Sequence, residues 1–325
     1  MSSIEPIHDF KQIKLLADPR RLKILRQLMA APASLTQVGQ AIGEHPAWVR
    51  HHLKQLEQAG LVEIVETRVT SGVVEKFYRA KAGGLMLQKL ILPETPGHPA
   101  VVFSGSHDLA VELLARILSK HLDVLTLSVG SLDGLMTLRQ GLCHLSGAHL
   151  LDSNGEYNTP FVQHIFPDRP MQMLTLAHRE QGLMTAPGNP KGIRSLVDLA
   201  RADVNFINRN AGSGTRLWLD HQLKAMGIAA ENIRGYKTTV STHTASAWAV
   251  FSGEADAAVG LRAAAHPLGL NFIPLFHERY DLIFPQEQVE LLGPLLDTLQ
   301  TGTFRRGVEG LTGYETLHTG EQIPL

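Results

Sequence analysis

The sequence predicts an α/β protein in two parts: a small N-terminal domain of short helices and paired strands, and a larger domain in which strands and helices alternate. Three observations support this fold class. Residues 18–60 contain three helix patterns with their own start and stop signals, and two strand patterns follow them. Beyond a proline-rich stretch, an apolar strand, a small-residue turn and a helix recur four times. A length of 325 residues suits two or three folding units.

The composition is that of a globular protein, with 44% hydrophobic and 19% charged residues. The single cysteine, Cys143, excludes an internal disulfide framework, and the 16 histidines show no repeated metal-ligand spacing. No apolar run approaches the roughly 20 residues that span a bilayer, and the N-terminus lacks the pattern of a secretory signal. We therefore expect a cytoplasmic protein with no membrane contact, no metal and no cofactor.

The two parts differ in charge. Residues 1–95 hold 13 Lys and Arg against 9 Asp and Glu, a net charge of +4, whereas the remainder holds 17 against 22, a net charge of −5. A basic module joined to an acidic one is typical of a nucleic-acid-binding domain with a separate partner domain.

Each N-terminal helix has a capping signal and two have glycine stops. The starts, in chain order, are Asp18-Pro19, the capping box Ser34–Gln37, and Pro46. The second and third helices end at Gly43 and Gly60, where glycine tolerates the left-handed conformation of a helix stop. In the third helix Val49, Leu53 and Leu56 form one inward-facing stripe.

Two strands, residues 61–66 and 73–80, alternate apolar and polar residues around a turn at Thr70-Ser71-Gly72. Short helices followed by such a ribbon describe a winged helix-turn-helix, whose last helix enters the DNA major groove. We expect four side chains of that helix to face base edges and three of the ribbon to face phosphates. These are Ala47, Arg50, His51 and Lys54 on the helix, and Arg68, Lys76 and Arg79 on the ribbon.

The segments "LADPRRLKILRQL" and "VRHHLKQLEQAGLVE" resemble the ArsR-type winged-helix repressors, over roughly residues 8–82. The resemblance implies a homodimer that binds an inverted repeat in double-stranded DNA. Many members sense soft metals through cysteines on the preceding helix, but the segment "LTQVGQAIG" has none. His45 and Trp48 stand where small polar residues are usual, which leaves the base preference open. A module that serves only dimerisation is the alternative.

A second domain follows the stretch "LPETPGHP", residues 92–99, whose prolines and glycine indicate a boundary. We therefore divide the chain into a DNA-binding domain at 1–92, a linker at 93–99 and a ligand-sensing domain at 100–325. The strand–turn–helix units are residues 100–118, 124–141, 204–227 and 235–260. Such alternation predicts parallel sheets that bind ligands at the carboxyl ends of their strands.

The turns of these units are suited to holding an anion. Four helix N-termini at one cleft would present free N–H groups and positive dipole ends to a common point. Small residues such as Gly212-Ser213-Gly214 let the main chain approach a ligand, and serine hydroxyls add neutral donors. We expect this site to hold a doubly charged oxyanion with no buried cation opposite it.

Catalytic motifs are missing from the same turns. The sequence has no P-loop, the third glycine of a dinucleotide fingerprint is replaced by Leu217, and none of Ser106, Ser131 and Ser213 lies in G-x-S-x-G. Residues 277–281 do not complete an H-E-x-x-H motif. Because the sequence offers no nucleophile–base pair, we predict a binding protein and not an enzyme.

Seven motifs in the second domain resemble, in order, the PBP-like domain related to periplasmic molybdate-binding proteins. They are "GSHD", "GSLDGL", "HLLDSNGEYNTP", "QGLMTAPGNPKGI", "NRNAGSGTR", "STHTASA" and "ERYDL". The resemblance implies a two-lobed, type II periplasmic-binding-protein-like α/β domain that closes on its ligand. It also implies ligand-binding residues in both lobes, namely Ser106, Ser131, Ser213, Gly214, Thr215, Thr242, His243 and Tyr280.

Some polar residues suit a four-oxygen ligand less well. Asp108 and Asp133 follow the proposed serine donors, and we expect them to act as favourable charges in a first helical turn. Asp152, Tyr157 and Asn158 form a polar loop that a larger ligand, such as a molybdopterin, would use. Three arginines would then pair with phosphate, although outward-facing salt bridges are the favoured prediction for Arg179, Arg209 and Arg216.

The sequence therefore predicts a one-component transcription regulator whose DNA binding is controlled by a small oxyanion, with molybdate or tungstate as the first candidates. The same fold sensing a molybdenum cofactor or another organic anion is one alternative, and an enzyme of molybdopterin metabolism is another. No residue indicates whether the ligand promotes or releases DNA binding, or whether the protein activates or represses.

Overall fold

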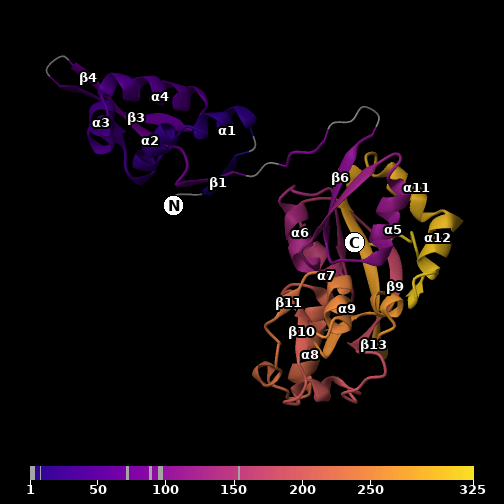
Figure 1. The fold of residues 1–325 in the computed structure, drawn as a ribbon. Helices are drawn as coiled ribbons and strands as arrows, with labels where there is room; N and C mark the ends of the chain where they lie inside the picture. Colours follow the sequence, from indigo (N-terminus) through magenta and orange to yellow (C-terminus); the bar gives the residue numbers. More distant parts are fainter. Residues whose placement is uncertain (1–3, 8, 71–72, 88–89, 94–97, 153) are drawn as a thin grey trace. The chain divides into compact units, whose positions relative to one another are not determined.

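The computed structural model describes residues 4–325 except 8, 71–72, 88–89, 94–97 and 153. The chain forms two compact units, Met1–Ile91 and Leu92–Leu325 (Figure 1). The division falls at the start of the proline-rich stretch, and residues 94–97 of the predicted linker lie outside the described residues.

The first unit has the winged helix-turn-helix fold that the sequence predicts. Its helices are α1 (Phe10–Leu16), α2 (Pro19–Ala30), α3 (Leu35–Ile42) and α4 (Pro46–Gln58). Its antiparallel sheet has the order β2-β4-β3, with β2 at Ala33–Ser34, β3 at Val62–Thr70 and β4 at Val73–Ala80. Residues 71–72 of the predicted turn lie outside the described residues.

The predicted capping signals are present in this unit. The Asp18 carboxylate accepts a hydrogen bond from the Arg20 N–H at the start of α2, and Ser34 and Gln37 form the reciprocal capping box of α3. Gly43 ends α3 with a φ of 74°, in the left-handed region that favours glycine. The predicted stripe of α4 is buried in a core shared with α2 and α3. Local signals therefore account for most of this unit.

Helix α1 and a parallel pair of strands, β1 (Ile4–Ile7) and β5 (Gly84–Leu87), were not predicted. The two strands come from opposite ends of the unit's sequence, and Ile4 lies opposite Gly84 in the pair. Ile4 is 71% exposed, so β1 carries little of the apolar pattern that would identify a buried strand.

The second unit contains one sheet in the order β11-β10-β12-β9-β13-β8-β6-β7, with β14 (Tyr314–Glu315) paired to β9. Strands β9 (Met171–Thr185) and β13 (Asn271–Pro285) pair antiparallel along their length. At one end they join the first lobe, and at the other end the second lobe (Figure 1). This two-lobed α/β arrangement agrees with the predicted fold class.

The four predicted strand–turn–helix units are all present. The first lobe has β6 (Ala100–Gly105), α5 (Leu109–Leu118), β7 (Asp123–Ser128), α6 (Ser131–Arg139), β8 (Leu145–Ala148) and α7 (Thr159–Ile165). The second has β10 (Phe206–Arg209), α8 (Gly214–Ala225), β11 (Thr239–Val240), α9 (His243–Phe251), β12 (Ala257–Leu261) and α10 (Arg262–Ala265). Within each lobe these strands pair in parallel, as alternation with helices requires.

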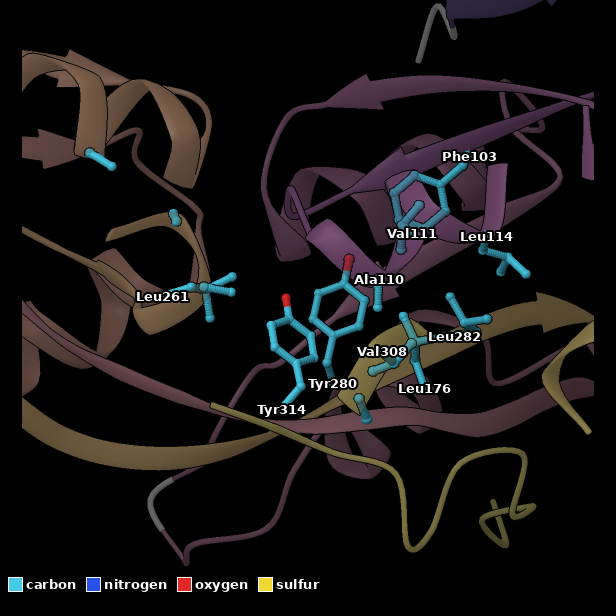
Figure 2. Close-up of a cluster of buried hydrophobic side chains, with 14 of the residues drawn as sticks. Phe103, Ala110, Val111, Leu114, Leu176, Leu261, Tyr280, Leu282, Val308 and Tyr314 are labelled. Carbon is cyan, nitrogen blue, oxygen red and sulfur yellow. The ribbon is translucent and has the colours of Figure 1, made fainter. Parts of the chain in front are cut away.

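The C-terminal segment packs on the first lobe, as predicted. Helices α11 (Gly293–Leu299) and α12 (Gly302–Glu309) contact α5. The core beneath them includes Phe103, Leu114 and Leu282, and two tyrosines, Tyr280 and Tyr314, project into it (Figure 2). Their hydroxyls bond to groups at the start of α5, so this core also holds the edge of the candidate site.

Candidate functional site

The helix starts of the two lobes meet inside the second unit. The Leu132 N–H of α6 donates to the Gly212 carbonyl before α8, with a nitrogen–oxygen distance of 3.3 Å. The Asn210 side-chain amide donates to the Val129 carbonyl at 2.6 Å. At the second crossing, the His243 N–H that begins α9 donates to Nδ1 of His107, which precedes α5, at 3.3 Å. The lobes are therefore in contact, with four helix N-termini near one buried region.

Two arginines lie buried in this region, which corrects the prediction that they face outward. Arg179 on β9 and Arg209 at the end of β10 are each 1% exposed. Arg179 donates through Nε to Glu278 at 2.7 Å and through Nη1 to Asp108 at 2.5 Å. Arg209 donates through Nη2 to the Ser241 carbonyl at 2.9 Å. Only Arg216 behaves as predicted, in a partly exposed pair with Asp220 at 2.8 Å.

Several buried N–H groups of these arginines have no partner among the described residues. They are Nη2 of Arg179 and both Nε and Nη1 of Arg209. Buried donors without partners cost free energy, and native proteins rarely leave them so unless a ligand, ion or water takes up the bond. The expectation of an anion site with no buried cation was therefore wrong, because two guanidinium groups lie at the site.

The two arginines differ in their electrostatic surroundings. Burial opposes the charge of Arg179, but the carboxylates of Glu278 and Asp108 outweigh it and raise the pKa of Arg179 above its ordinary value. Burial and, as the next largest cause, the nearby charge of Arg179 lower the pKa of Arg209 to about 9. Arg209 is thus a buried cation that contacts no carboxylate in the described structure and would gain from a bound negative charge.

The carboxylates of the site already accept hydrogen bonds from the protein. Asp108 caps α5 by accepting from the Ala110 and Val111 N–H groups at 2.7 and 3.0 Å. Its other oxygen accepts from Arg179 and from the Tyr314 hydroxyl at 2.6 Å. Glu278 accepts from Arg179, from the Gln181 amide and from His149. Burial opposes its charge, but Arg179 and His149 lower the pKa of Glu278 to about 2.

His149 links Glu278 to Ser106. Its Nδ1 lies 2.7 Å from Glu278, and its Nε2 lies 2.9 Å from the Ser106 hydroxyl oxygen. Burial lowers the pKa of His149, so the ring is neutral near pH 7. Because the carboxylate only accepts, the ring proton lies on Nδ1, and the Ser106 hydroxyl donates to Nε2. This Ser–His–Glu sequence of bonds was not predicted.

His243 is the other unpartnered group of the site. Its side chain is fully buried at the start of α9, and neither ring nitrogen has a partner among the described residues. Burial, with the charge of Arg209 nearby, holds the pKa of His243 well below its ordinary value. The neutral ring therefore offers one N–H donor and one acceptor to a ligand. We call Ser106, Asp108, His149, Arg179, Arg209, His243 and Glu278 the anion cluster.

The remaining predicted ligand residues lie at the same lobe junction, but several have their side chains engaged. The Ser213 hydroxyl donates to the Asn210 carbonyl at 2.9 Å and caps α8, and the Ser213 N–H donates to the same carbonyl at 3.3 Å, so both donors of this serine are engaged. Thr242 caps α9 in the same way. The Ser131 hydroxyl accepts from the His149 N–H, and Thr215 donates to Gln181. The Tyr280 hydroxyl donates to the Ser106 carbonyl.

His149, Gln181 and Glu278 were not predicted as residues of the site. A signal for some of them exists, because residues two apart on a strand share one face. Arg179 and Gln181 on β9, and Glu278 and Tyr280 on β13, are such pairs, and they lie in the polar runs 178–181 and 277–281. Polar residues that recur at this spacing on a buried strand indicate a buried polar site.

Gly214, the first residue of α8, lies against His149. A Cβ atom built there would lie 2.6 Å from Cε1 and Nδ1 of the His149 ring and from the His149 carbonyl oxygen. We therefore expect Gly214→Ala to hold the lobes apart and to weaken the binding of a ligand between them at least about tenfold, or 1.4 kcal/mol. Calorimetric titration checks this. Gly293→Ala is the matched control, since a Cβ there meets nothing within 4 Å; equal affinities in both variants would contradict closure at Gly214.

The predicted DNA-binding residues lie on the surface of the first unit. Ala47, Arg50, His51 and Lys54 are exposed on α4, and Lys76 and Arg79 are exposed on β4. Arg68 is also exposed but pairs with Glu66 at 2.6 Å, so it would have to exchange this partner to contact phosphate. No helix in the described ranges is both long and apolar enough to cross a membrane.

Comparisons with known proteins agree with this architecture. Residues 16–65 match the model of a helix-turn-helix domain, and residues 113–300 match that of a PBP superfamily domain. The uncharacterized protein YvgK of Bacillus subtilis (strain 168) is 37% identical over 233 residues, which is 71% of this chain and 75% of that protein.

Solved structures align with this chain at low sequence identity. A structure from Clostridium perfringens, described as a phosphate ABC transporter substrate-binding protein with bound phosphate, aligns with a TM-score of 0.51 at 14% identity, over 66% of this chain and 99% of that chain. A tungstate ABC transporter structure from Geobacter sulfurreducens aligns with a TM-score of 0.45 at 12% identity, over 65% of this chain and 98% of that chain. The chain belongs to the PBP superfamily and carries a helix-turn-helix domain at its N-terminal end.

Proposed function

We propose that the protein is a cytoplasmic transcription regulator whose PBP-like domain binds an oxyanion, with molybdate or tungstate as the first candidates, and thereby changes the affinity of the winged helix for DNA. The observation that carries the proposal is the set of buried, unpartnered N–H groups of Arg179 and Arg209 beside the neutral His243 ring. These donors lie at the lobe junction, where closure of the domain would enclose a ligand.

The charge of the anion cluster is suited to an anion of two charges. Its two guanidinium groups and two carboxylates sum to zero, but Arg179 satisfies both carboxylates and Arg209 contacts neither. Three further helices, α6, α8 and α9, begin at the lobe junction without an acidic cap. Each helix N-terminus carries roughly half a positive charge. Because the formal charges of the cluster cancel, these three dipole ends supply its surplus positive charge of roughly 1.5, which offsets most of the charge of a dianion.

The hydrogen-bonding capacity of the cluster favours an oxyanion without protons. Near neutral pH phosphate carries at least one proton, whereas molybdate, tungstate and sulfate carry none. A ligand proton needs an acceptor, and each carboxylate oxygen of Asp108 and Glu278 already accepts from the protein. The one free acceptor of the cluster, among the described residues, is then a ring nitrogen of His243, so a protonated phosphate must direct its proton there, and any orientation that misses this nitrogen costs about 1–3 kcal/mol.

Binding is proposed in preference to catalysis. Ser106, His149 and Glu278 have the hydrogen-bond order of a hydrolytic triad. However, the Ser106 side chain is fully buried, and its backbone N–H donates to the Gly147 carbonyl at 3.0 Å. That N–H is therefore not free to stabilise an oxyanion intermediate, as such chemistry requires.

Isothermal titration calorimetry with molybdate, tungstate, sulfate and phosphate tests the ligand. We expect saturable binding of molybdate and tungstate, and binding of phosphate at least about tenfold weaker, which is 1.4 kcal/mol. The absence of binding for all four anions would contradict an oxyanion sensor. Tighter binding of phosphate than of molybdate would retain the sensor and contradict the argument from ligand protons.

Substitutions in the winged helix-turn-helix unit are expected to weaken DNA binding without changing molybdate binding. Arg50→Ala and Lys54→Ala should each weaken binding to the protein's operator by about 1–3 kcal/mol if they contact bases. Molybdate affinity should not change, because α4 belongs to the other unit. Electrophoretic or fluorescence titration of upstream DNA at several salt concentrations checks this, with Lys81→Ala as an exposed control. Parallel loss of DNA and molybdate affinity would contradict separate modules.

Regulation is proposed to follow from a population shift. An oxyanion that contacts both lobes favours the closed form, and closure changes the DNA affinity of a homodimer bound to an inverted repeat. Sedimentation of the protein with and without operator DNA measures the dimer directly.

A further inference from the structure

A cavity of about 500 Å³ lies next to the anion cluster and is larger than a four-oxygen anion requires. It is bounded by the loop after β8, by α7, by one face of α8 and by β13. His149, Gly214 and Glu278, which lie in or against the anion cluster, also line this cavity. Ligand pockets for organic molecules typically have volumes of about 300–1,000 Å³.

The walls of this cavity are largely aromatic and aliphatic. We call it the aromatic compartment; its apolar lining is Leu151, Tyr157, Phe161, Leu217, Trp218 and Phe276. Trp218 and Phe276 stack, with ring centroids 3.9 Å apart and planes inclined by 22°. Leu151 and Leu217 are 42% and 43% exposed, so apolar surface is left open to solvent beside a buried polar site. Contiguous apolar surface at such a place is typical of a ligand-binding site.

The polar groups of the compartment are few and lie at specific places. Asp152, His221 and Gln222 contribute polar side chains to its lining, and Glu278 and His149 connect it to the anion cluster. An apolar wall with a small number of polar groups fixes the orientation of a ring that carries polar substituents. A bare oxyanion would use none of the aromatic surface.

From this arrangement we infer that the compartment binds a planar aromatic or heteroaromatic ring. The full ligand is an organic oxyanion of the class of aryl or heterocyclic phosphate monoesters. Its charged end occupies the anion cluster. Only the placement of the charged end rests on the proposed function, because that function assigns the anion cluster to an oxyanion. A monoester loses its second proton with a pKa near 6, so near pH 7.5 it is largely the unprotonated dianion that the cluster favours. The ring adds apolar contacts that inorganic anions lack.

Calorimetry with phenyl phosphate and inorganic phosphate, at pH 7.5, tests the inference. We expect phenyl phosphate to bind at least about tenfold more tightly than phosphate, a difference of 1.4 kcal/mol. Trp218→Ala should remove this advantage while leaving molybdate affinity unchanged, and Trp218→Phe should keep most of it. Trp248→Ala is the control, because Trp248 on α9 is a tryptophan outside the compartment, 58% exposed and with its ring 5.5 Å from that of Phe251.

The outcomes separate the two proposals. Equal affinities of phenyl phosphate and phosphate, with molybdate still bound, would overturn the compartment and leave the oxyanion sensor intact. Loss of molybdate binding in Trp218→Ala but not in Trp248→Ala would also overturn it, since Trp218 would then be structural. Phenyl phosphate binding without any inorganic anion binding would support the compartment and contradict the bare-oxyanion sensor. If no probe binds, both proposals fail.

Discussion

Replacing Arg209 by methionine is expected to weaken oxyanion binding strongly and, at the same time, to stabilise the ligand-free protein. Arg209 is fully buried, and two of its three guanidinium nitrogens have no partner among the described residues. Burial lowers its pKa to about 9, which reflects the cost of holding an uncompensated charge there. Replacing a buried charge with an apolar side chain of similar size is often stabilising, by about 1–4 kcal/mol.

The ligand-bound protein should respond in the opposite direction. A buried charge that meets an anion is worth several kcal/mol, so removal of Arg209 should weaken molybdate binding at least about a hundredfold, or 2.7 kcal/mol. Thermal unfolding with and without molybdate, together with calorimetry, measures both effects. Arg201→Met, at an arginine that pairs with Asp203 on the surface of the same lobe, is the control. A variant at Arg209 that is less stable and still binds molybdate would show a structural role instead.

Molybdate affinity is expected to fall as pH rises, because binding takes up a proton at His149. In the free protein burial lowers the pKa of His149, and the Ser106 hydroxyl is committed to its Nε2. For Ser106 to donate to a bound anion, Nε2 must become the donor, which requires the protonated ring. The anion stabilises this imidazolium, as Glu278 already does from the Nδ1 side, whereas Arg179 and Arg209 oppose it.

The direction of the pH effect follows from the pKa of His149 in the free protein and in the molybdate complex. The pKa of His149 is below its ordinary value in the free protein and rises in the complex. Molybdate affinity is therefore highest below the pKa of His149 in the free protein. As pH rises from that pKa to the pKa of His149 in the complex, the affinity falls by about tenfold per pH unit. Molybdate itself does not titrate between pH 6.5 and 8, so the uptake belongs to the protein.

Calorimetry in buffers of different ionisation enthalpy counts the protons directly. We expect His149→Gln to bind molybdate without proton uptake, since glutamine keeps a donor and an acceptor but cannot titrate. His277→Gln is the matched control, at the preceding position to Glu278 on β13 and 64% exposed on its side chain. Unchanged proton uptake in His149→Gln would place the titrating group elsewhere, with His243 and His107 as the next histidines to test.

The winged helix and the four strand–turn–helix units could be predicted because their signals are local. Asp18, the Ser34–Gln37 box and Gly43 act within one turn of the chain, and each has the predicted cap in the structure. The β1–β5 pair could not be predicted in the same way. Its strands lie about 80 residues apart, and the exposed Ile4 carries no burial pattern.

Some features of the candidate site follow from the sequence, and others are determined only by the tertiary structure. The turns at Ser106, Ser131 and Ser213 and their helices follow from sequence, because small residues before an apolar stripe define a helix start. The environment of Arg179 does not, since its partners Asp108 and Glu278 lie 71 and 99 positions away. By itself an arginine in a sequence is most simply placed on the surface, where water stabilises its charge.

By itself the sequence therefore determined the two modules, their secondary structure and the helix starts that an anion could meet. Only the tertiary structure decided which polar groups are buried together, which of them satisfy one another and which are left for a ligand. The physical reason is that strand and helix formation depend on neighbours within a few residues, whereas the energy of a buried charge depends on every group that folding brings around it.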